Sequence, residues 1–207
     1  MGKGKKIAVF GGTFDPVHIG HCMVASSVIR EGVADEVWIM VSPQNPLKRE
    51  NRLSPEEDRL AMVRAACNDT AGLVASDFEF GLPRPSYTAA TLRALKKRWP
   101  ENEYRLLTGS DNWLLFGRWR DPEVILSQFG LIIYPRPDMP IPDGFRPLEE
   151  MPPDWEERVE MLHDIPMALI SSTYIRESVA RGESIRFLVP ETVERYISEH
   201  RLYSGVD

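Results

Sequence analysis

Residues 6–22 read Lys-Ile-Ala-Val-Phe-Gly-Gly-Thr-Phe-Asp-Pro-Val-His-Ile-Gly-His-Cys, and the rest of the chain can be ordered around this segment. The short apolar, partly β-branched run at 7–10 predicts a strand that is buried on both faces of a parallel sheet. Gly11 and Gly12 then permit a sharp turn and leave room for a ligand close to the backbone. Apolar residues recur at helical spacing over 17–33, so the segment predicts a strand, a turn and a helix.

Two histidines open that predicted helix. His18 and His21 lie three positions apart and therefore share one helix face. A helix start presents unpaired N–H groups and a partial positive charge, which favours a polyphosphate, and two imidazoles add donors. A glycine pair is often only a turn, and a histidine at a helix start is often only a cap. Four such features within eleven residues favour phosphate binding, although neither common phosphate-loop pattern is present.

Length, charge and cysteine content limit the class of protein. A chain of 207 residues predicts one well-buried domain, and a formal net charge of -6 argues against a nucleic-acid partner. No segment approaches the ~20 apolar residues of a membrane span, and the apolar run after the first lysines is too short for a signal peptide. Cys22 and Cys67 both fall in predicted helices, which favours a reducing cytoplasm. The oligomeric state stays open, a homo-oligomer included.

Strand-like and helix-like segments alternate along the chain. This pattern predicts an α/β fold with a Rossmann-like, doubly wound parallel sheet of five or six strands. The segment at 138–154 is rich in proline and acids without a clear period, so we expect an irregular surface excursion there. A small helical part from about residue 171 is expected to complete the single domain. The strands are expected at 7–10, 36–41, 73–80, 105–108, 131–134 and 159–163.

Polar residues follow several of these strands. Ligands of open α/β sheets bind at the carboxyl ends of the strands, so such residues are candidates for a site. Lys48 follows the second strand and could neutralise a phosphate, or it could be an ordinary solvated lysine. Asp111 follows the fourth strand, where an acid suits ribose hydroxyls or a magnesium shell. Arg136 follows the fifth strand and is expected at the same edge.

Two further helix starts carry hydroxyl groups. Ser86-Tyr87-Thr88 precedes a helix expected at 89–99, and Ile170-Ser171-Ser172-Thr173-Tyr174-Ile175-Arg176 opens another. Capping explains part of both patterns, but N–H groups, hydroxyls and an arginine one turn on also suit an anion. Trp113 and Trp119 are more often core residues than ligand contacts, yet one of them could stack on a heteroaromatic ring.

These motifs, in this order, resemble the bacterial nicotinate-nucleotide adenylyltransferases, which belong to the nucleotidyltransferases related to class I aminoacyl-tRNA synthetases. The resemblance extends from residue 7 to about 196. It implies the joining of ATP and nicotinate mononucleotide into nicotinate adenine dinucleotide and pyrophosphate, a late step of NAD synthesis. For this reaction we expect Mg²⁺ to be carried on the ATP phosphates with few protein ligands, which is consistent with the absence of an obvious carboxylate cage in the sequence. Zinc is not expected, because the His-x-x-His pair lacks further Cys or carboxylate partners at a recognisable ligand spacing.

The resemblance also implies a role for each matched residue. His18, His21, Lys48 and Arg176 would position and neutralise the transferred and leaving phosphates. The residues implied for the acceptor are Lys48, Tyr87, Thr88, Trp119 and Arg136. The residues implied for ATP are Gly11, Gly12, Thr13, Phe14, His18, His21, Asp111, Ile170, Ser171, Ser172, Thr173 and Arg176.

Two positions depart from the family pattern. Leu47 stands where the family often has a histidine before the lysine, and Arg120 stands where it often has a second aromatic residue beside Trp119. Both differences concern the acceptor pocket. Two alternatives remain open at this point: a pantetheine-phosphate adenylyltransferase, which shares the opening motif, and a non-catalytic nucleotide sensor on the same fold.

Overall fold

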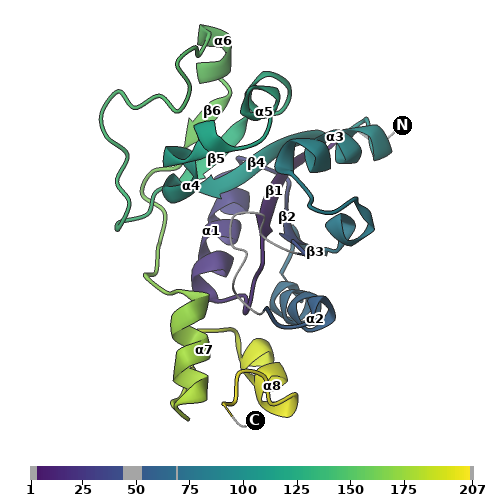
Figure 1. Cartoon of the computed structure of the whole chain (residues 1–207), viewed down its shortest axis with the longest axis vertical. Helices are drawn as coiled ribbons and strands as arrows, with labels where there is room; N and C mark the ends of the chain where they lie inside the picture. The colour runs from purple at the N-terminus through teal and green to yellow at the C-terminus, as the bar shows by residue number, and fades with distance from the viewer. Residues whose placement is uncertain (1–3, 44–52, 69, 206–207) are drawn as a thin grey trace.

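A six-stranded parallel sheet forms the centre of the molecule, in the order β3-β2-β1-β4-β5-β6 (Figure 1). The computed structural model describes residues 4–43, 53–68 and 70–205. The predicted doubly wound α/β fold is therefore confirmed, with six strands. Their bounds are β1 (Lys6–Gly12), β2 (Glu36–Val41), β3 (Leu73–Ser76), β4 (Glu103–Gly109), β5 (Leu131–Tyr134) and β6 (Val159–Met161).

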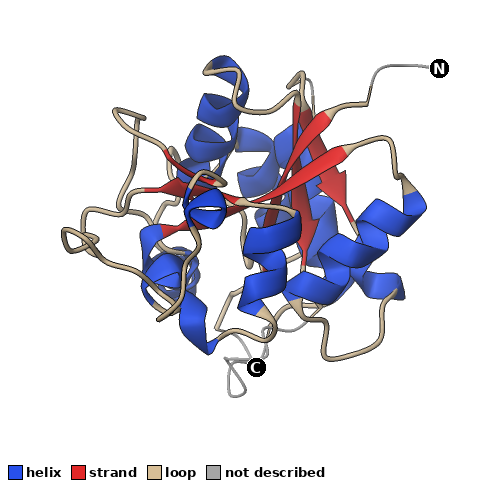
Figure 2. Ribbon diagram, turned by 90° about the horizontal axis from the view of Figure 1, so that it is seen from above, coloured by secondary structure: helices blue, strands red, loops and turns tan. Residues whose placement is uncertain are grey.

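Helices flank both faces of the twisted sheet (Figure 2). Along β1, Ala8 and Phe10 pack into one core with α1, α2, α7 and α8, whereas Ile7 and Val9 pack into the opposite core with α3, α4 and α5. Successive strand residues point to opposite faces, so a strand apolar throughout supplies both cores. The helices are α1 (Ile19–Arg30), α2 (Glu56–Cys67), α3 (Thr88–Arg98), α4 (Ser110–Leu114), α5 (Pro122–Gln128), α6 (Pro153–Glu156), α7 (Ser172–Ala180) and α8 (Glu191–Glu199), with short 3-10 turns η1 (Phe78–Gly81) and η2 (Phe116–Arg118).

Most predicted strands agree with the structure, but the second half of one predicted strand was wrong. The strands expected at 36–41 and 131–134 have those bounds. The strand expected at 73–80 ends at Ser76, because the Ser76 hydroxyl accepts the Phe78 N–H at 3.3 Å and the chain turns into η1. The first helix is shorter than expected at both ends: it begins after the loop that holds His18 and stops before Gly32, which has a left-handed φ of 69°.

The winding of the sheet reverses between β1 and β4. From β1 the chain passes to β2 and β3 on one side, and then returns to β4, β5 and β6 on the other. The carboxyl ends of β1 and β4 thus border a topological switch point, where ligands of such folds bind. In Figure 1, α7 and α8 lie beside the carboxyl end of β1. None of the helices in residues 4–43, 53–68 and 70–205 is long and apolar enough to cross a membrane.

Candidate functional site

The end of β1 supplies the floor of the site. No heavy atom lies within 4 Å of the position that a Gly11 Cβ would occupy, so this backbone faces open space. A Cβ on Gly12 would lie 3.0 Å from the Phe14 ring. The left-handed residue of the loop is Phe14 (φ 47°), not a glycine. The two glycines therefore provide access and room, while the turn itself is made at Phe14.

The two histidines form a stacked pair at the start of α1. Their ring centroids lie 3.6 Å apart with planes 22° from parallel. The His18 backbone N–H donates to His21 Nδ1 at 3.3 Å, so in the neutral His21 ring the proton resides on Nε2. A Cβ on Gly20 would lie 3.1 Å from His18 Nδ1 and 3.4 Å from the Ala168 carbonyl oxygen. The glycine between the histidines thus makes room for the His18 ring.

Both imidazoles are neutral at pH 7. Burial lowers the pKa of His18 to about 4, and the positive charge of Arg136 acts in the same direction. Burial also lowers the pKa of His21 well below its ordinary value, helped by His18 and Arg136. Each ring therefore offers one N–H donor to an anion rather than a permanent positive charge.

The lowered pKa of His18 in the folded protein predicts that the free energy of unfolding depends on pH. In the unfolded chain His18 titrates near pH 6.5, so the unfolded state takes up its proton first and the free energy of unfolding decreases as the pH falls from about 6.5 towards 4. The full loss from His18 is about 3 kcal/mol. Denaturant unfolding of the wild type and of His18→Gln across this window is expected to show a shallower decrease for the variant. Equal slopes would contradict the buried neutral histidine.

A charged pair lies just after β4 and β5, and the positive charge of its arginine acts on both histidines. Arg136 Nη1 lies 3.3 Å from Asp111 Oδ2, and its Nη2 lies 3.1 Å from Asp138 Oδ2. A Cβ on Gly109 would lie 2.4 Å from Asp111 Oδ1, so glycine is needed before this acid. Asp111 Oδ1 is buried and has no hydrogen-bond partner among the described residues. As the sequence predicted, Asp111 and Arg136 meet at one sheet edge.

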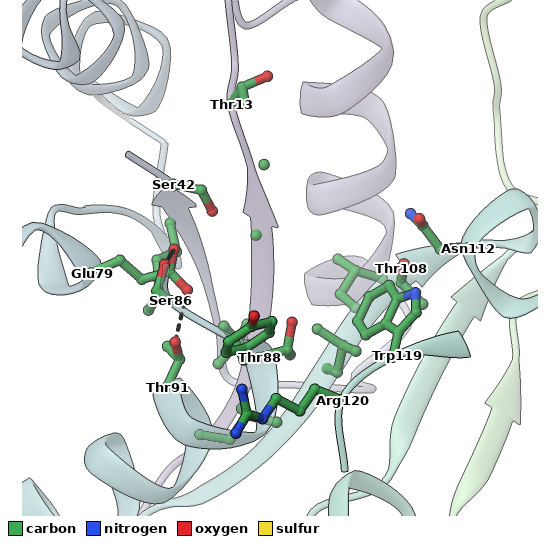
Figure 3. A pocket seen from close by; sticks show the side chains of 18 of the residues that line it. Thr13, Ser42, Glu79, Ser86, Thr88, Thr91, Thr108, Asn112, Trp119 and Arg120 are labelled. Carbon is green, nitrogen blue, oxygen red and sulfur yellow. Dashed lines mark hydrogen bonds between the residues drawn. The ribbon is translucent and has the colours of Figure 1, made fainter. Parts of the chain in front are cut away.

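A separate cavity of about 340 Å³ opens on the other side of the β1 end (Figure 3). Tyr87, Thr88 and Trp119 line it, as do Gly11, Gly12 and Thr13. Arg136 and the two histidines are not among its lining residues. The structure thus divides the predicted site residues into two neighbouring groups, which share the backbone of the β1 end.

Aromatic and cationic groups form one wall of this cavity. Trp119 is half-buried, and its Nε1 has no hydrogen-bond partner in the described part of the chain. The Arg120 guanidinium lies over the Tyr87 ring, 4.8 Å from its centroid, and Arg118 also lines the cavity. Trp113 is 2% exposed and packs in the core with Phe116. Trp119 is therefore the tryptophan that can reach a ligand.

A buried carboxylate that the sequence did not single out supports the opposite wall. Glu79 accepts hydrogen bonds from the Ser86 hydroxyl at 3.2 Å and the Thr91 hydroxyl at 2.8 Å (Figure 3). These bonds tie η1 to the start of α3, where Thr88 lies. Glu79 was overlooked because the strand expected at 73–80 ran through it.

The start of α7 contacts the loop that carries the histidines. Ser171 caps the helix, since its hydroxyl accepts the Tyr174 N–H at 3.1 Å. The Ser172 hydroxyl donates to the Pro16 carbonyl at 2.9 Å, and Arg176 Nη1 donates to the Asp15 carbonyl at 2.7 Å. Arg176 also donates to the Thr173 hydroxyl at 3.3 Å, and Ile170 packs against the core. The structure therefore brings 170–176 to the histidine loop.

Arg59 is a second residue that the sequence analysis missed. Its side chain is almost fully buried on α2 and donates to four carbonyls, one from the loop after β1 and three from the connection between β2 and α2. The acceptors are the carbonyl oxygens of Thr13 (2.8 Å), Ser42 (2.7 Å), Pro43 (3.0 Å) and Ser54 (3.0 Å). The signal was present in the sequence: Arg59 lies on the helix face of the buried Met62 and Val63.

Comparison with known proteins agrees with this geometry. Residues 9–178 match the cytidylyltransferase-like family. A protein of Bacteroides fragilis, named as a probable nicotinate-nucleotide adenylyltransferase, is 42% identical over 94% of this chain and 92% of its own length. A protein of Bacteroides thetaiotaomicron with the same name is 40% identical over 98% and 95%. The chain belongs to the nicotinate-nucleotide adenylyltransferase family.

Solved structures of nicotinate-nucleotide adenylyltransferases share the fold. The nicotinic acid mononucleotide adenylyltransferase of Plasmodium falciparum, solved in complex with NaAD, superposes with a TM-score of 0.76 at 18% identity. The match covers 96% of this chain and 97% of that one. At this identity the similarity concerns the fold alone.

Two features expected of a nicotinate-nucleotide adenylyltransferase need separate comment. Lys48 and Leu47 lie outside the described residues, so the role of Lys48 stays a prediction. Within 4–43, 53–68 and 70–205, no group of three or more His, Cys, Asp or Glu side chains is arranged to hold a metal ion.

Proposed function

We propose that this protein transfers the adenylyl group of ATP to nicotinate mononucleotide, giving nicotinate adenine dinucleotide and pyrophosphate in NAD biosynthesis. One observation carries the proposal: a phosphate-suited group of donors and a separate aromatic cavity meet at the same end of β1. Two substrates that must react with each other need such adjacent sites. The names of the relatives agree with this reaction.

ATP is proposed to occupy the histidine side. The N–H groups at the start of α1, the Nε2–H of His21 and the ring N–H of His18 suit the phosphates. Asp111, with one free buried oxygen, suits a ribose hydroxyl or the base. Arg136 is assigned here to the nucleotide side because it contacts Asp111 and not the cavity. The remaining proposed ATP contacts are Gly11, Gly12, Thr13, Phe14, Ile170, Ser171, Ser172, Thr173 and Arg176.

Nicotinate mononucleotide is proposed to occupy the cavity. Trp119 can stack on the pyridine ring, and the unpaired N–H groups at the start of α3, beside Thr88, suit the carboxylate. Arg118 and Arg120 place two positive charges at this cavity. An acid is therefore favoured over the neutral amide, and Arg120 offers charge in place of a second aromatic ring.

The reaction asks the protein mainly for orientation and charge stabilisation. A phosphate oxygen of the mononucleotide attacks the α-phosphorus of ATP, the bond to the bridging oxygen breaks, and pyrophosphate leaves with that oxygen. The attacking group is already an anion, so no protein nucleophile is needed; burial raises the pKa of Cys22 to about 11, which disfavours a thiolate. Mg²⁺ bound to the ATP phosphates would screen their charge. His18, His21 and Arg176 would hold the phosphates in line.

Two further properties are proposed with the function. Residues 1–207 act as one domain, because α7 donates hydrogen bonds to the histidine loop. Cys22 and Cys67 are free thiols, which suits a reducing cytoplasm.

A panel of acceptors tests the function. The protein is incubated with Mg-ATP and, in parallel, with nicotinate mononucleotide, nicotinamide mononucleotide or phosphopantetheine, and pyrophosphate release is measured. The largest kcat/KM is expected with nicotinate mononucleotide. A preference for phosphopantetheine would identify a different adenylyltransferase, and no release with any acceptor would indicate a nucleotide sensor.

A further inference from the structure

The loop before α1 is tied to the far end of the chain through Asp15. This side chain is 2% exposed, and its Oδ1 accepts a hydrogen bond from the Tyr203 hydroxyl at 2.7 Å, across 188 residues of sequence. Its Oδ2 accepts the Ser54 N–H at 3.2 Å. A buried carboxylate needs such partners, because an unsatisfied charge is costly in the interior. Within the described ranges, Tyr203 is the only side chain that donates to this carboxylate.

The backbone of the same loop is held by other distant side chains. Arg59 donates to the Thr13 carbonyl, Arg176 to the Asp15 carbonyl, and Ser172 to the Pro16 carbonyl. These bonds fix the course of the backbone. The Asp15 side chain adds an attachment that leads to the C-terminal segment after α8. The loop is therefore held from α2, from α7 and from residue 203.

Unusual backbone conformations accompany this attachment at both ends. Tyr203 has a φ of 62°, and Phe14, next to Asp15, has a φ of 47°. Bulky residues rarely adopt left-handed conformations unless their surroundings impose them. The Phe14 ring also lies edge-on to His21, with centroids 5.0 Å apart. A change in the position of Asp15 would thus pass directly to the histidine pair.

We propose that Tyr203 is a positioning residue for ATP: it fixes Asp15 and thereby orients His18 and His21 towards the phosphates. It touches neither substrate and acts only through the loop. This inference rests on the proposed function, since it assigns ATP to the histidine side.

Tyr203→Phe removes the hydroxyl and keeps the ring. We expect kcat/KM for ATP to fall about tenfold, because a small misplacement of the donors weakens in-line positioning. The KM for nicotinate mononucleotide is expected to stay within about twofold of wild type, since the cavity is formed by other elements. Amide hydrogen exchange of residues 13–22 is expected to become faster.

Tyr196→Phe is the matched control. The Tyr196 hydroxyl donates to Asp58 Oδ1 at 2.8 Å, so this variant also removes a Tyr–Asp bond between the C-terminal part and another element. Among the described residues, the Tyr196 hydroxyl makes no hydrogen bond to the histidine loop. If both variants lower the melting temperature alike while both retain wild-type kcat/KM for ATP, Tyr203 is merely structural and the proposal is overturned.

Two further experiments keep the proposal testable if Tyr203→Phe does not fold or if the wild type lacks the proposed activity. If Tyr203→Phe does not fold, Asp15→Asn is used. Its neutral amide oxygen accepts a weaker hydrogen bond from the Tyr203 hydroxyl than the carboxylate does, so a smaller loss in ATP kcat/KM is expected. Unchanged kinetics would contradict the proposal. If the wild type shows no transfer to nicotinate mononucleotide, the proposed function fails on its own. Binding of a non-hydrolysable ATP analogue then tests the role of Tyr203. If the analogue binds to Tyr203→Phe about tenfold more weakly than to Tyr196→Phe, the proposal is supported. Equal binding to the two variants overturns it.

Discussion

His21→Ala is expected to lower kcat by about 10²- to 10³-fold, the loss typical of removing one preorganised donor from a site of developing charge. The ring donates from Nε2, because its Nδ1 accepts the His18 N–H. Its contribution is a hydrogen bond that strengthens as charge moves onto the leaving phosphates. The substitution removes a half-buried ring, so we expect the free energy of unfolding to fall by no more than about 1–2 kcal/mol. Steady-state kinetics and denaturant unfolding measure the two effects separately.

His163→Ala provides the control for this variant. His163 is exposed and follows β6, the edge strand of the sheet. Its replacement is expected to leave kcat and stability within experimental error of wild type. A turnover of His21→Ala within a few-fold of wild type would remove His21 from the catalytic assignment.

Arg59→Met is expected to give the largest loss of stability. Methionine keeps much of the length and apolar volume but leaves the carbonyl oxygens of Thr13, Ser42, Pro43 and Ser54 without their donor. Breaking such a buried charged network costs about 3–5 kcal/mol. For a chain of this size that corresponds to a fall in melting temperature of about 10 °C or more. Thermal unfolding measures the change.

Arg64→Met tests whether this loss is specific to the buried arginine. Arg64 lies on the same helix, is exposed, and pairs with Asp77 at 3.2 Å. An exposed ion pair contributes at most about 1 kcal/mol, so the melting temperature is expected to change by only a few degrees. Similar losses for Arg59→Met and Arg64→Met would contradict the account of the carbonyl cluster.

The bounds of two strands follow from local signals in the sequence. Apolar runs gave β2 and β5 their bounds, since a strand buried on both faces carries no competing polar pattern. The end of β3 was mispredicted because Phe78 and Phe80 continue the apolar alternation, and only the hydrogen bond from Phe78 N–H to Ser76 reveals the turn.

Part of the site was predictable because it is encoded locally. The histidines, Asp111 and Arg136 each directly follow a strand or open a helix, and parallel strands bring such positions to one edge. The division of the site residues into a histidine group and a cavity group was not predictable, because it depends on the side of β1 on which each loop lies. The supports of the site were missed for a related reason: Arg59 and Tyr203 act on partners 46 and 188 positions away.

Transfer of the adenylyl group can be followed through the phosphorus atoms of ATP. The protein is incubated with nicotinate mononucleotide and Mg-ATP labelled either at the α- or at the γ-phosphorus, and the products are separated. Adenylyl transfer places the α-label in nicotinate adenine dinucleotide and the γ-label in pyrophosphate, and this is the expected result. Appearance of the γ-label in the acceptor or in inorganic phosphate would contradict it.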